Sequence, residues 1–192
     1  LLSRTRYEPH QQYQGRTIAQ IADAMDLEGA DAILELVEKS EGGAGAIYFG
    51  IREDDLEYAL TLPWTSIGSD GSALAPEGEL ARSHPHPRSY GTFPRVIARY
   101  VRERGVLSMA EAVHKMTGLA ASQLGLPDRG KLAEGMKADV AVFDAEAIRD
   151  LATFEEPHQL SEGVEYLVVN GQLVLDGGAH TGALPGRVIR RR

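Results

Sequence analysis

A polar, proline-rich loop near the middle of the chain gathers side chains that can do chemistry. Within 19 positions it contains one carboxylate, two imidazoles and two guanidinium groups, contributed by Asp70, Arg82, His84, His86 and Arg88. Carboxylates transfer protons, imidazoles are common zinc ligands, and a guanidinium can hold a carboxylate through two parallel hydrogen bonds. The loop is therefore the first candidate for a reactive site.

Asp70 ends an apolar run, "WTSIG", and is flanked by small residues, with Gly68 and Gly71 close by. A carboxylate at the carboxyl end of a parallel strand lies where α/β barrels keep their reactive groups. Aspartate is also common in turns, where it hydrogen-bonds to the nearby backbone. Position and spacing leave both interpretations open.

His84 and His86 have the His-x-His spacing of some metal-binding pairs. However, Pro85 separates them and Pro87 follows, which favours extended or polyproline backbone at both histidines. Polyproline backbone has three residues per turn, so the two side chains need not converge. No third ligand is evident nearby. We therefore expect one of them to be a hydrogen-bonding loop residue rather than a zinc ligand.

Arg88 lies in the same proline-bounded loop, which would hold its guanidinium in place to capture a carboxylate. An ion pair with a neighbouring aspartate or glutamate explains this residue equally well, and both interpretations stay open. The remaining histidines have no ligand spacing between them: His10, His114, His158 and His180.

Two apolar runs are predicted to be the strands that lead to this loop. They are "AIYFG", residues 46–50, and "WTSIGSD", residues 64–70, with a helix pattern between them whose first turn is acidic. Strand, short helix, strand is typical of a βαβ unit, so the two strands are predicted to be parallel and buried. After the loop, a helix is predicted from Thr92 to Gly105, with Pro94 in its first turn.

The rest of the chain divides into a helical part and a β-rich end. Thr17 and the Ser108/Glu111 pair are predicted to cap helices, and a further helix is predicted to bury a stripe of Ile33, Leu34 and Val37. From about residue 127 the pattern becomes β-rich. It contains a strand over 138–144 and a hairpin with the type I′ turn pair Asn170-Gly171.

The composition narrows the classes of function. A net charge of −8 argues against nucleic acid or an anionic membrane as the main partner, and the basic end, Arg187 and Arg190–Arg192, is predicted to be a solvated tail. The chain has no cysteine for a disulfide or a cysteine-based zinc site, which agrees with a cytoplasmic location. No apolar run approaches the roughly 20 residues of a membrane span. The chain begins at Leu1 rather than at a methionine, so we expect it to be part of a longer protein.

Three stretches resemble the amidohydrolase superfamily: "GSDG", "HPRSYGTFPRV" and "LSMAEAVHKMTGLAASQLGLPDRGKLAEGMKADVAVFD". The last is similar to a segment shared widely, including by dihydroorotases and hydantoinases. The HPR-x-x-GTF stretch after SDG resembles more specifically the D-aminoacylase branch, the N-acyl-D-amino-acid deacylases. "ATFEEPHQ" and "HTGALPGRV" also look like that branch, and the resemblance runs from about Tyr13 to Arg187.

This resemblance implies an α/β fold: the C-terminal part of a metal-dependent (β/α)8 amidohydrolase barrel, residues 1–126, followed by strands of a small β-sandwich domain, residues 127–192. It implies that Asp70 closes the last barrel strand as a metal ligand and general acid/base, and that Arg88 binds the α-carboxylate of the substrate. In such an enzyme zinc polarises the amide carbonyl and lowers the pKa of bound water. The products would be a carboxylic acid and a free D-amino acid.

The departure from the family is large. Its first-strand His-x-His, its metal-binding cysteine and its mid-barrel histidines have no counterpart here, and they would precede Leu1. A catalytic zinc needs about three protein ligands, so we expect the isolated chain to be inactive and not to retain zinc. The expected partners are an N-acyl-D-amino acid and the missing N-terminal part of the barrel or a second chain. The alternatives are an amidohydrolase acting on cyclic amides, or a non-catalytic module that assembles with a partner chain.

Overall fold

The computed structural model describes residues 1–189, so Arg190–Arg192 of the predicted basic tail lie outside the described residues. The chain forms two compact units, each assembled from separate stretches of sequence. One, called the loop unit here, comprises Leu1–Gly50, Asp70–Tyr90 and Ala152–Leu160, and the other, called the helix–sheet unit, comprises the rest. The predicted domain boundary between residues 126 and 127 stays a prediction.

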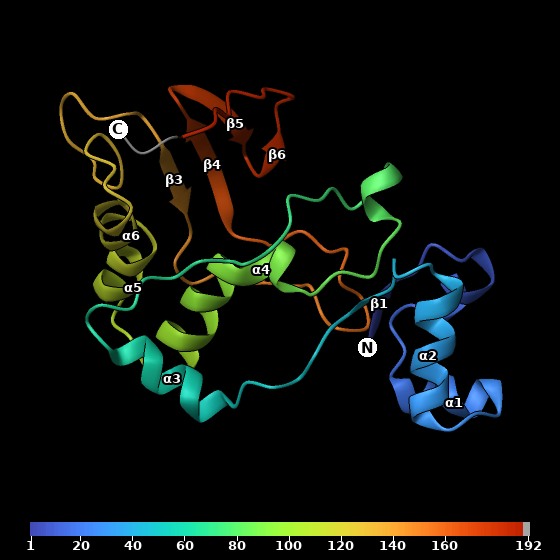
Figure 1. The fold of residues 1–192 in the computed structure, drawn as a ribbon. Coiled ribbons are helices and arrows are strands. Elements are labelled where there is room, and N and C mark those ends of the chain that lie inside the picture. Colours follow the sequence, from blue (N-terminus) through green and yellow to red (C-terminus); the bar gives the residue numbers. More distant parts are fainter. Residues whose placement is uncertain (190–192) are drawn as a thin grey trace. The chain divides into compact units, whose positions relative to one another are not determined.

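The loop unit begins with β1 (Leu2–Arg4), which pairs antiparallel with β2 (Gly45–Ala46). Between them lie the 3₁₀ helix η1 (Glu8–Tyr13), α1 (Ile18–Met25) and α2 (Gly29–Lys39), and η2 (Gly78–Ala81) follows in the second stretch (Figure 1). A capping box between Thr17 and Gln20 starts α1, as predicted for Thr17. The core of this unit consists of Leu2, Ile21 and Leu36.

The predicted buried stripe on α2 is wrong. Ala32 and Leu36 face the core, whereas Ile33, Leu34 and Val37 are exposed. Both faces of this helix carry apolar residues, so periodicity alone does not distinguish the buried one.

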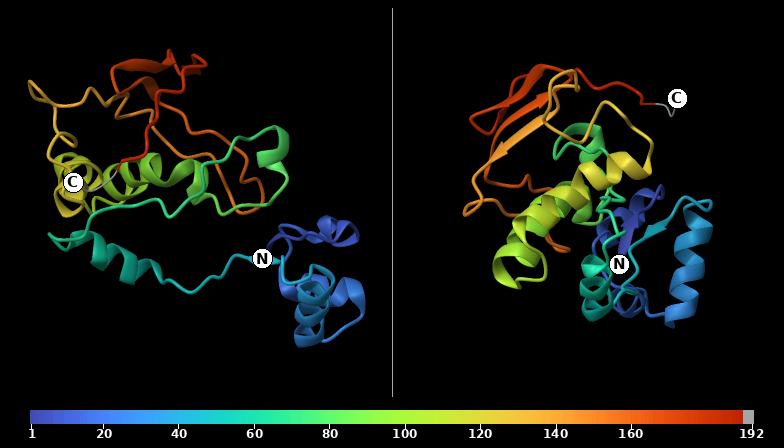
Figure 2. Two further views of the ribbon diagram at one scale, coloured as in Figure 1. Left: turned by 45° about the horizontal axis from the view of Figure 1, so that its top comes forward. Right: turned by 90° about the vertical axis from the view of Figure 1, so that its left-hand side faces the viewer.

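The predicted parallel strand pair is also absent from the described structure. Only Gly45–Ala46 is in a ladder at the first run, and residues 64–70 form no strand (Figure 2). Tyr48, Phe49 and Trp64 are 87%, 67% and 66% exposed. The physical reason is that a strand needs a partner along its hydrogen-bonding edge. In the described residues, 47–50 and 64–70 have isolated backbone hydrogen bonds, such as Ile67 N–H to Lys115 O, but no ladder.

The helix–sheet unit contains α3 (Glu53–Thr61), α5 (Met109–Met116) and α6 (Gly118–Gln123). A capping box between Ser108 and Glu111 starts α5, as predicted. The predicted helix after the loop starts four residues early: α4 (Arg88–Arg95) already includes Arg88, and it continues as the π-helical segment η3 (Val96–Glu103). The first three residues of α4, Arg88–Tyr90, belong to the loop unit. Pro94 therefore lies inside the helix rather than in its first turn. Its missing N–H interrupts the regular ladder just before the π-helical segment begins.

Apolar side chains from α3, η3, α5 and the loop before α5 form the core of this unit: Leu60, Val96, Tyr100, Leu107 and Ala112. A four-stranded antiparallel sheet follows, with the order β3 (Val140–Phe143), β4 (Val164–Val169), β5 (Gln172–Asp176) and β6 (Ala179–His180) (Figure 1). Asn170 and Gly171 both have positive φ, of 47° and 80°, which confirms the predicted hairpin turn. None of the helices described here is long and apolar enough to span a membrane.

Candidate active site

Asp70 and Arg88 meet in the loop unit. The Nη2 of Arg88 lies 2.8 Å from the Oδ2 of Asp70, so both predicted site residues form one ion pair. This is the pairing with a neighbouring aspartate that the sequence left open as the alternative for Arg88, and its role in binding a carboxylate stays a prediction. The Asp70 side chain is 86% exposed and that of Arg88 is 44% exposed, which leaves the carboxylate and part of the guanidinium open to solvent. The pair thus combines a group that can accept a proton with a group that can hold an anion.

Backbone geometry brings these two side chains together. Asp70 has a φ of 46°, in the left-handed region, where aspartate is one of the few tolerated non-glycine residues. A Cβ on Gly71 would lie 2.9 Å from the Cα of Ser89 and 3.1 Å from the carbonyl oxygen of Arg88. The N–H of Ser72 donates to the Oγ of Ser89 at 3.2 Å. The segment after Asp70 therefore rests directly on the first turn of α4, and only glycine permits this approach.

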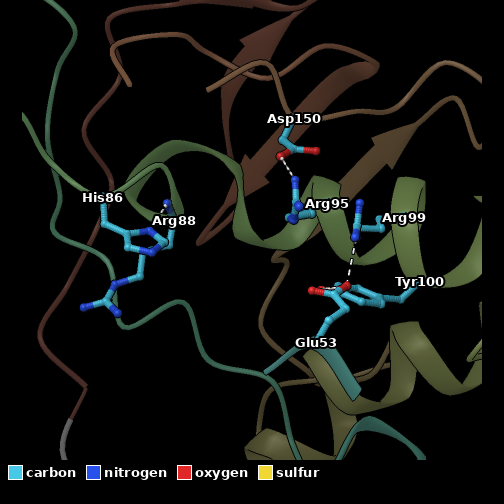
Figure 3. Close-up of polar contacts among 7 residues, drawn as sticks. All are labelled: Glu53, His86, Arg88, Arg95, Arg99, Tyr100 and Asp150. Carbon is cyan, nitrogen blue, oxygen red and sulfur yellow. Dashed lines mark hydrogen bonds and ion pairs between the residues drawn. The ribbon is translucent and has the colours of Figure 1, made fainter. Parts of the chain in front are cut away.

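His86 supports the start of α4. The backbone N–H of Arg88 donates to the Nδ1 of His86 at 3.0 Å (Figure 3), so this nitrogen accepts and carries no proton at the contact. The His86 ring packs edge-on against Phe154, with centroids 5.0 Å apart. An acceptor on one of the first N–H groups of a helix acts as a cap. His86 therefore helps to set the direction in which the helix presents Arg88.

His84 has a separate partner. Its Nε2–H donates to the carbonyl oxygen of Phe154 at 2.5 Å, and its ring fills the space where a Cβ on Gly15 would lie 2.7 Å from Cε1. The prediction of a hydrogen-bonding loop histidine is confirmed. Among the residues that the structure describes, no group of three or more His, Asp or Glu side chains could hold a metal ion.

Two further contributors, Phe154 and His158, lie in the stretch Ala152–Leu160 of the same unit. The Nε2–H of His158 donates to the carbonyl oxygen of Ser83 at 2.7 Å, and the hydroxyl of Tyr90 donates to its Nδ1 at 3.1 Å. Burial raises the pKa of Tyr90, so its hydroxyl stays protonated and able to donate. These contacts join residues 68 to 75 positions apart. No spacing rule in the sequence connects them.

A second polar cluster lies in the helix–sheet unit. Arg99 Nε and the Tyr100 hydroxyl donate to the same Glu53 oxygen, at 3.0 and 3.1 Å (Figure 3). Burial acts to raise the pKa of Glu53, but these hydrogen bonds and the nearby positive charges lower it overall. Arg95 Nη1 lies 2.9 Å from Asp150 Oδ2 in the same unit. These pairs tie α3 to the π-helical segment and brace the start of that segment.

A cavity of about 450 Å³ also lies in the helix–sheet unit. It is lined mainly by apolar side chains of α4, α5 and β3, and its charged lining residues are Lys131 and Asp139. It contains neither Asp70 nor Arg88, so it is separate from the candidate site.

Residues 66–175, more than half of the chain, match the sequence pattern of the amidohydrolase family. The chain belongs to this family. The match includes both Asp70 and Arg88, and it extends through β3, β4 and most of β5 of this amidohydrolase chain.

Solved and curated amidohydrolases sharpen the comparison. An N-acyl-D-aspartate deacylase of Alcaligenes xylosoxydans xylosoxydans is 41% identical over 175 residues, which are 91% of this chain and 33% of the relative. The N-acyl-D-glutamate deacylase of Bordetella bronchiseptica, solved with zinc and a phosphonate mimic of the tetrahedral intermediate, matches with a TM-score of 0.78 and 36% identity, over 90% of this chain and 34% of that one. A D-aminoacylase mutant in complex with CuCl2 matches with a TM-score of 0.85 and 38% identity, over 100% of this chain and 37% of that one. This amidohydrolase chain thus spans about a third of the length of its relatives.

Proposed function

We propose that this chain is the C-terminal part of a zinc-dependent deacylase that hydrolyses N-acyl-D-amino acids to a D-amino acid and a carboxylic acid. The observation that carries the proposal is the 2.8 Å contact between Asp70 and Arg88. It supports one site for both residues, in a chain whose relatives include deacylases of N-acyl-D-aspartate and N-acyl-D-glutamate.

The two side chains have complementary roles in this proposal. An N-acyl amino acid has lost its amine charge but keeps its α-carboxylate, so it reaches the enzyme as an anion. Arg88 holds that carboxylate through two parallel hydrogen bonds. Asp70 accepts a proton from the attacking water and returns it to the leaving nitrogen, which would otherwise depart as an unstable anion.

A carboxylate-binding arginine favours linear substrates over hydantoins, which carry no carboxylate. This argues for deacylation rather than the opening of a hydantoin ring, the second candidate reaction within the family. Arg88 gives no comparable preference for one D-amino acid over another.

The described residues do not by themselves make a zinc site, because Asp70 is not part of any group of three or more potential ligands. In the proposed enzyme, residues of a longer polypeptide or of a second chain therefore have to complete the zinc site. The exposed aromatic side chains of Tyr48, Phe49 and Trp64 support such a partner. In the proposed complete protein, residues 46–50 and 64–70 gain neighbours and become late barrel strands, and β3–β6 form part of the β-sandwich. A cytoplasmic location stays a prediction.

A chimera tests the proposal. The matching C-terminal third of the Alcaligenes N-acyl-D-aspartate deacylase is replaced by this chain, and zinc content and hydrolysis of N-acetyl-D-aspartate, its L-enantiomer and hydantoin are measured. We expect the chimera to bind zinc and to hydrolyse only the D-enantiomer. Arg88→Lys should abolish this hydrolysis, whereas Arg82→Lys, the matched control in the same loop, should retain it. A folded, zinc-loaded chimera that opens hydantoin but leaves N-acetyl-D-aspartate intact would contradict the proposal.

The isolated 192-residue chain is measured in parallel, because the proposal expects it to be inactive and free of zinc. Deacylase activity of the chain purified alone would refute that expectation. A stable oligomer without zinc would favour the non-catalytic module instead.

A further inference from the structure

One imidazole bridges the stretch that carries Arg88. His158 donates from Nε2 to the carbonyl oxygen of Ser83 at 2.7 Å and accepts at Nδ1 from the hydroxyl of Tyr90 at 3.1 Å. Ser83 and Tyr90 are the two ends of an eight-residue stretch with Arg88 inside it. His158 comes from Ala152–Leu160, so a distant segment of the loop unit closes this stretch at both ends.

We propose that His158 is a positioning residue for Arg88: by joining Ser83 to Tyr90 it fixes where the guanidinium meets the carboxylate of the substrate. This inference rests on the proposed function of Arg88. In this role His158 contacts neither the substrate nor a metal ion.

The interior of the stretch Ser83–Tyr90 is already stiff, so the position of Arg88 depends mainly on how the two ends of the stretch are held. Pro85 and Pro87 fix their own φ angles, and Pro85 is buried. His84 is anchored to the carbonyl oxygen of Phe154, and His86 caps Arg88. A stiff segment moves as a body about its two ends, so a bridge between those ends removes most of the freedom that remains.

The chemistry of the bridge explains why a histidine is used. The carbonyl oxygen of Ser83 can only accept, so Nε2 must carry the ring proton and Nδ1 is left to accept from Tyr90. Neutral imidazole therefore offers a donor and an acceptor on opposite sides of one rigid ring. Glutamine carries a donor and an acceptor at the same end of its side chain, so it reproduces only one of the two bonds.

The test uses the 192-residue chain itself, labelled with 15N and observed by NMR. In the wild type we expect a protonated Nε2 and an unprotonated Nδ1 on His158. The second readout is the rate at which the Nε–H of Arg88 exchanges with water. His158→Ala removes both hydrogen bonds, whereas Tyr90→Phe and His158→Gln each remove one. His114→Ala, at an exposed histidine on α5, is the matched control.

Each lost hydrogen bond is expected to speed this exchange about fivefold. Tyr90→Phe and His158→Gln should therefore resemble each other, His158→Ala should show the product of both effects, and His114→Ala should match the wild type. Because Tyr90→Phe and His158→Gln keep one bond, the comparison survives even if His158→Ala does not fold.

An Nδ1–H tautomer, or exchange in Tyr90→Phe and His158→Gln equal to that of the wild type, would overturn the proposal. Titration of the chimeric deacylase with N-acetyl-D-aspartate separates this outcome from failure of the proposed function. If the ligand leaves the Arg88 resonance of the folded, zinc-loaded chimera unmoved while the variants of the 192-residue chain still speed its exchange, the carboxylate role fails and the positioning by His158 stands.

Discussion

The stretch Ser83–Tyr90 in the loop unit is held by imidazoles that reach main-chain atoms, whereas the helices of the helix–sheet unit are held by a buried apolar cluster. In the first region His84, His86 and His158 each make directional hydrogen bonds, and the candidate pair Asp70–Arg88 beside them is exposed. In the second region Leu60, Val96 and Tyr100 are almost fully buried, and partly buried apolar side chains pack against them.

This difference predicts which substitutions should lower stability and which should change the geometry at Arg88. Apolar burial supplies most of the free energy of folding, but it does not depend on precise angles between groups. Substitutions in the buried cluster of Leu60, Val96, Tyr100, Leu107 and Ala112, called the helix cluster here, should therefore lower the free energy of unfolding. Hydrogen bonds contribute little net free energy each but depend on angle and distance. Changes in the loop should therefore alter the geometry at Arg88 more than they alter the stability of the chain.

The largest effect is expected at Lys115, at the edge of the helix cluster. Lys115 is 5% exposed, and its ammonium donates to the carbonyl oxygens of Leu62 and Thr65, at 2.5 and 3.1 Å. Lys115→Met leaves both acceptors without this donor, so we expect the free energy of unfolding to fall by about 2–3 kcal/mol. Urea denaturation measures the loss.

Lys137→Met is the control for that prediction, because Lys137 is an exposed lysine of the same unit. It should change stability by no more than about 0.5 kcal/mol. Equal effects of the two substitutions would show that the buried ammonium does not support the helix cluster.

The next effect is expected at Gly71, where the loop touches α4. A Cβ there would lie 2.9 Å from the Cα of Ser89, which is backbone and cannot rotate away. Gly71→Ala should therefore cost about 1–3 kcal/mol and separate Asp70 from Arg88. Gly68→Ala is matched to it, since a Cβ on Gly68 would meet nothing within 4 Å. A crystal structure of Gly71→Ala with the ion pair intact would contradict this prediction.

Local signals in the sequence predict much of the scaffold. Thr17 and Ser108 start helices because a capping side chain acts within three residues, and Asn170-Gly171 forms its turn because both residues tolerate positive φ. The runs 46–50 and 64–70 fail as strands because pairing depends on a neighbour that the local sequence does not specify.

The candidate site was predictable only in part. Resemblance to the D-aminoacylases singles out Asp70 and Arg88, and the structure brings them together. The supports from Phe154 and His158 could not be predicted, because those contacts join residues about 70 positions apart and no periodicity connects them.

A smaller and pH-dependent effect is expected at Glu53 in the helix–sheet unit. The folded state lowers its pKa below the ordinary value of 4.5 despite burial, through hydrogen bonds from Arg99 and Tyr100. The resulting stabilisation is present above the unfolded pKa and is lost as the pH falls through the folded pKa. The side chain is 37% exposed, so screening by water should keep the contribution below about 1 kcal/mol.

Urea denaturation of wild type and Glu53→Gln, from neutral pH down through the acidic range, measures the contribution of ionised Glu53 to the free energy of unfolding. The difference in the free energy of unfolding between wild type and Glu53→Gln should shrink on acidification. Glu134→Gln, at an exposed position of the same unit, should show no such trend. A difference that grows as the pH falls would have the wrong sign for a lowered pKa.

Asp70→Asn is expected to have the smallest effect on stability, although Asp70 has the central role in the proposed reaction. Asp70→Asn removes an exposed ion pair, which is worth little, and asparagine accepts the left-handed backbone at least as well as aspartate. We expect stability within about 0.5 kcal/mol of the wild type.

Asp26→Asn isolates the ion pair from the backbone effect, because Asp26 has a similar φ of 55° at the end of α1 and lies outside the site. If both variants change stability alike, the Asp70–Arg88 contact adds nothing to folding and is free to serve binding and proton transfer. In the chimeric deacylase Asp70→Asn should nevertheless lower kcat by about 100-fold or more, since an amide cannot exchange the proton. A loss of more than about 1.5 kcal/mol for Asp70→Asn alone would instead make the pair a structural brace, because an exposed pair with only a binding role contributes less than that.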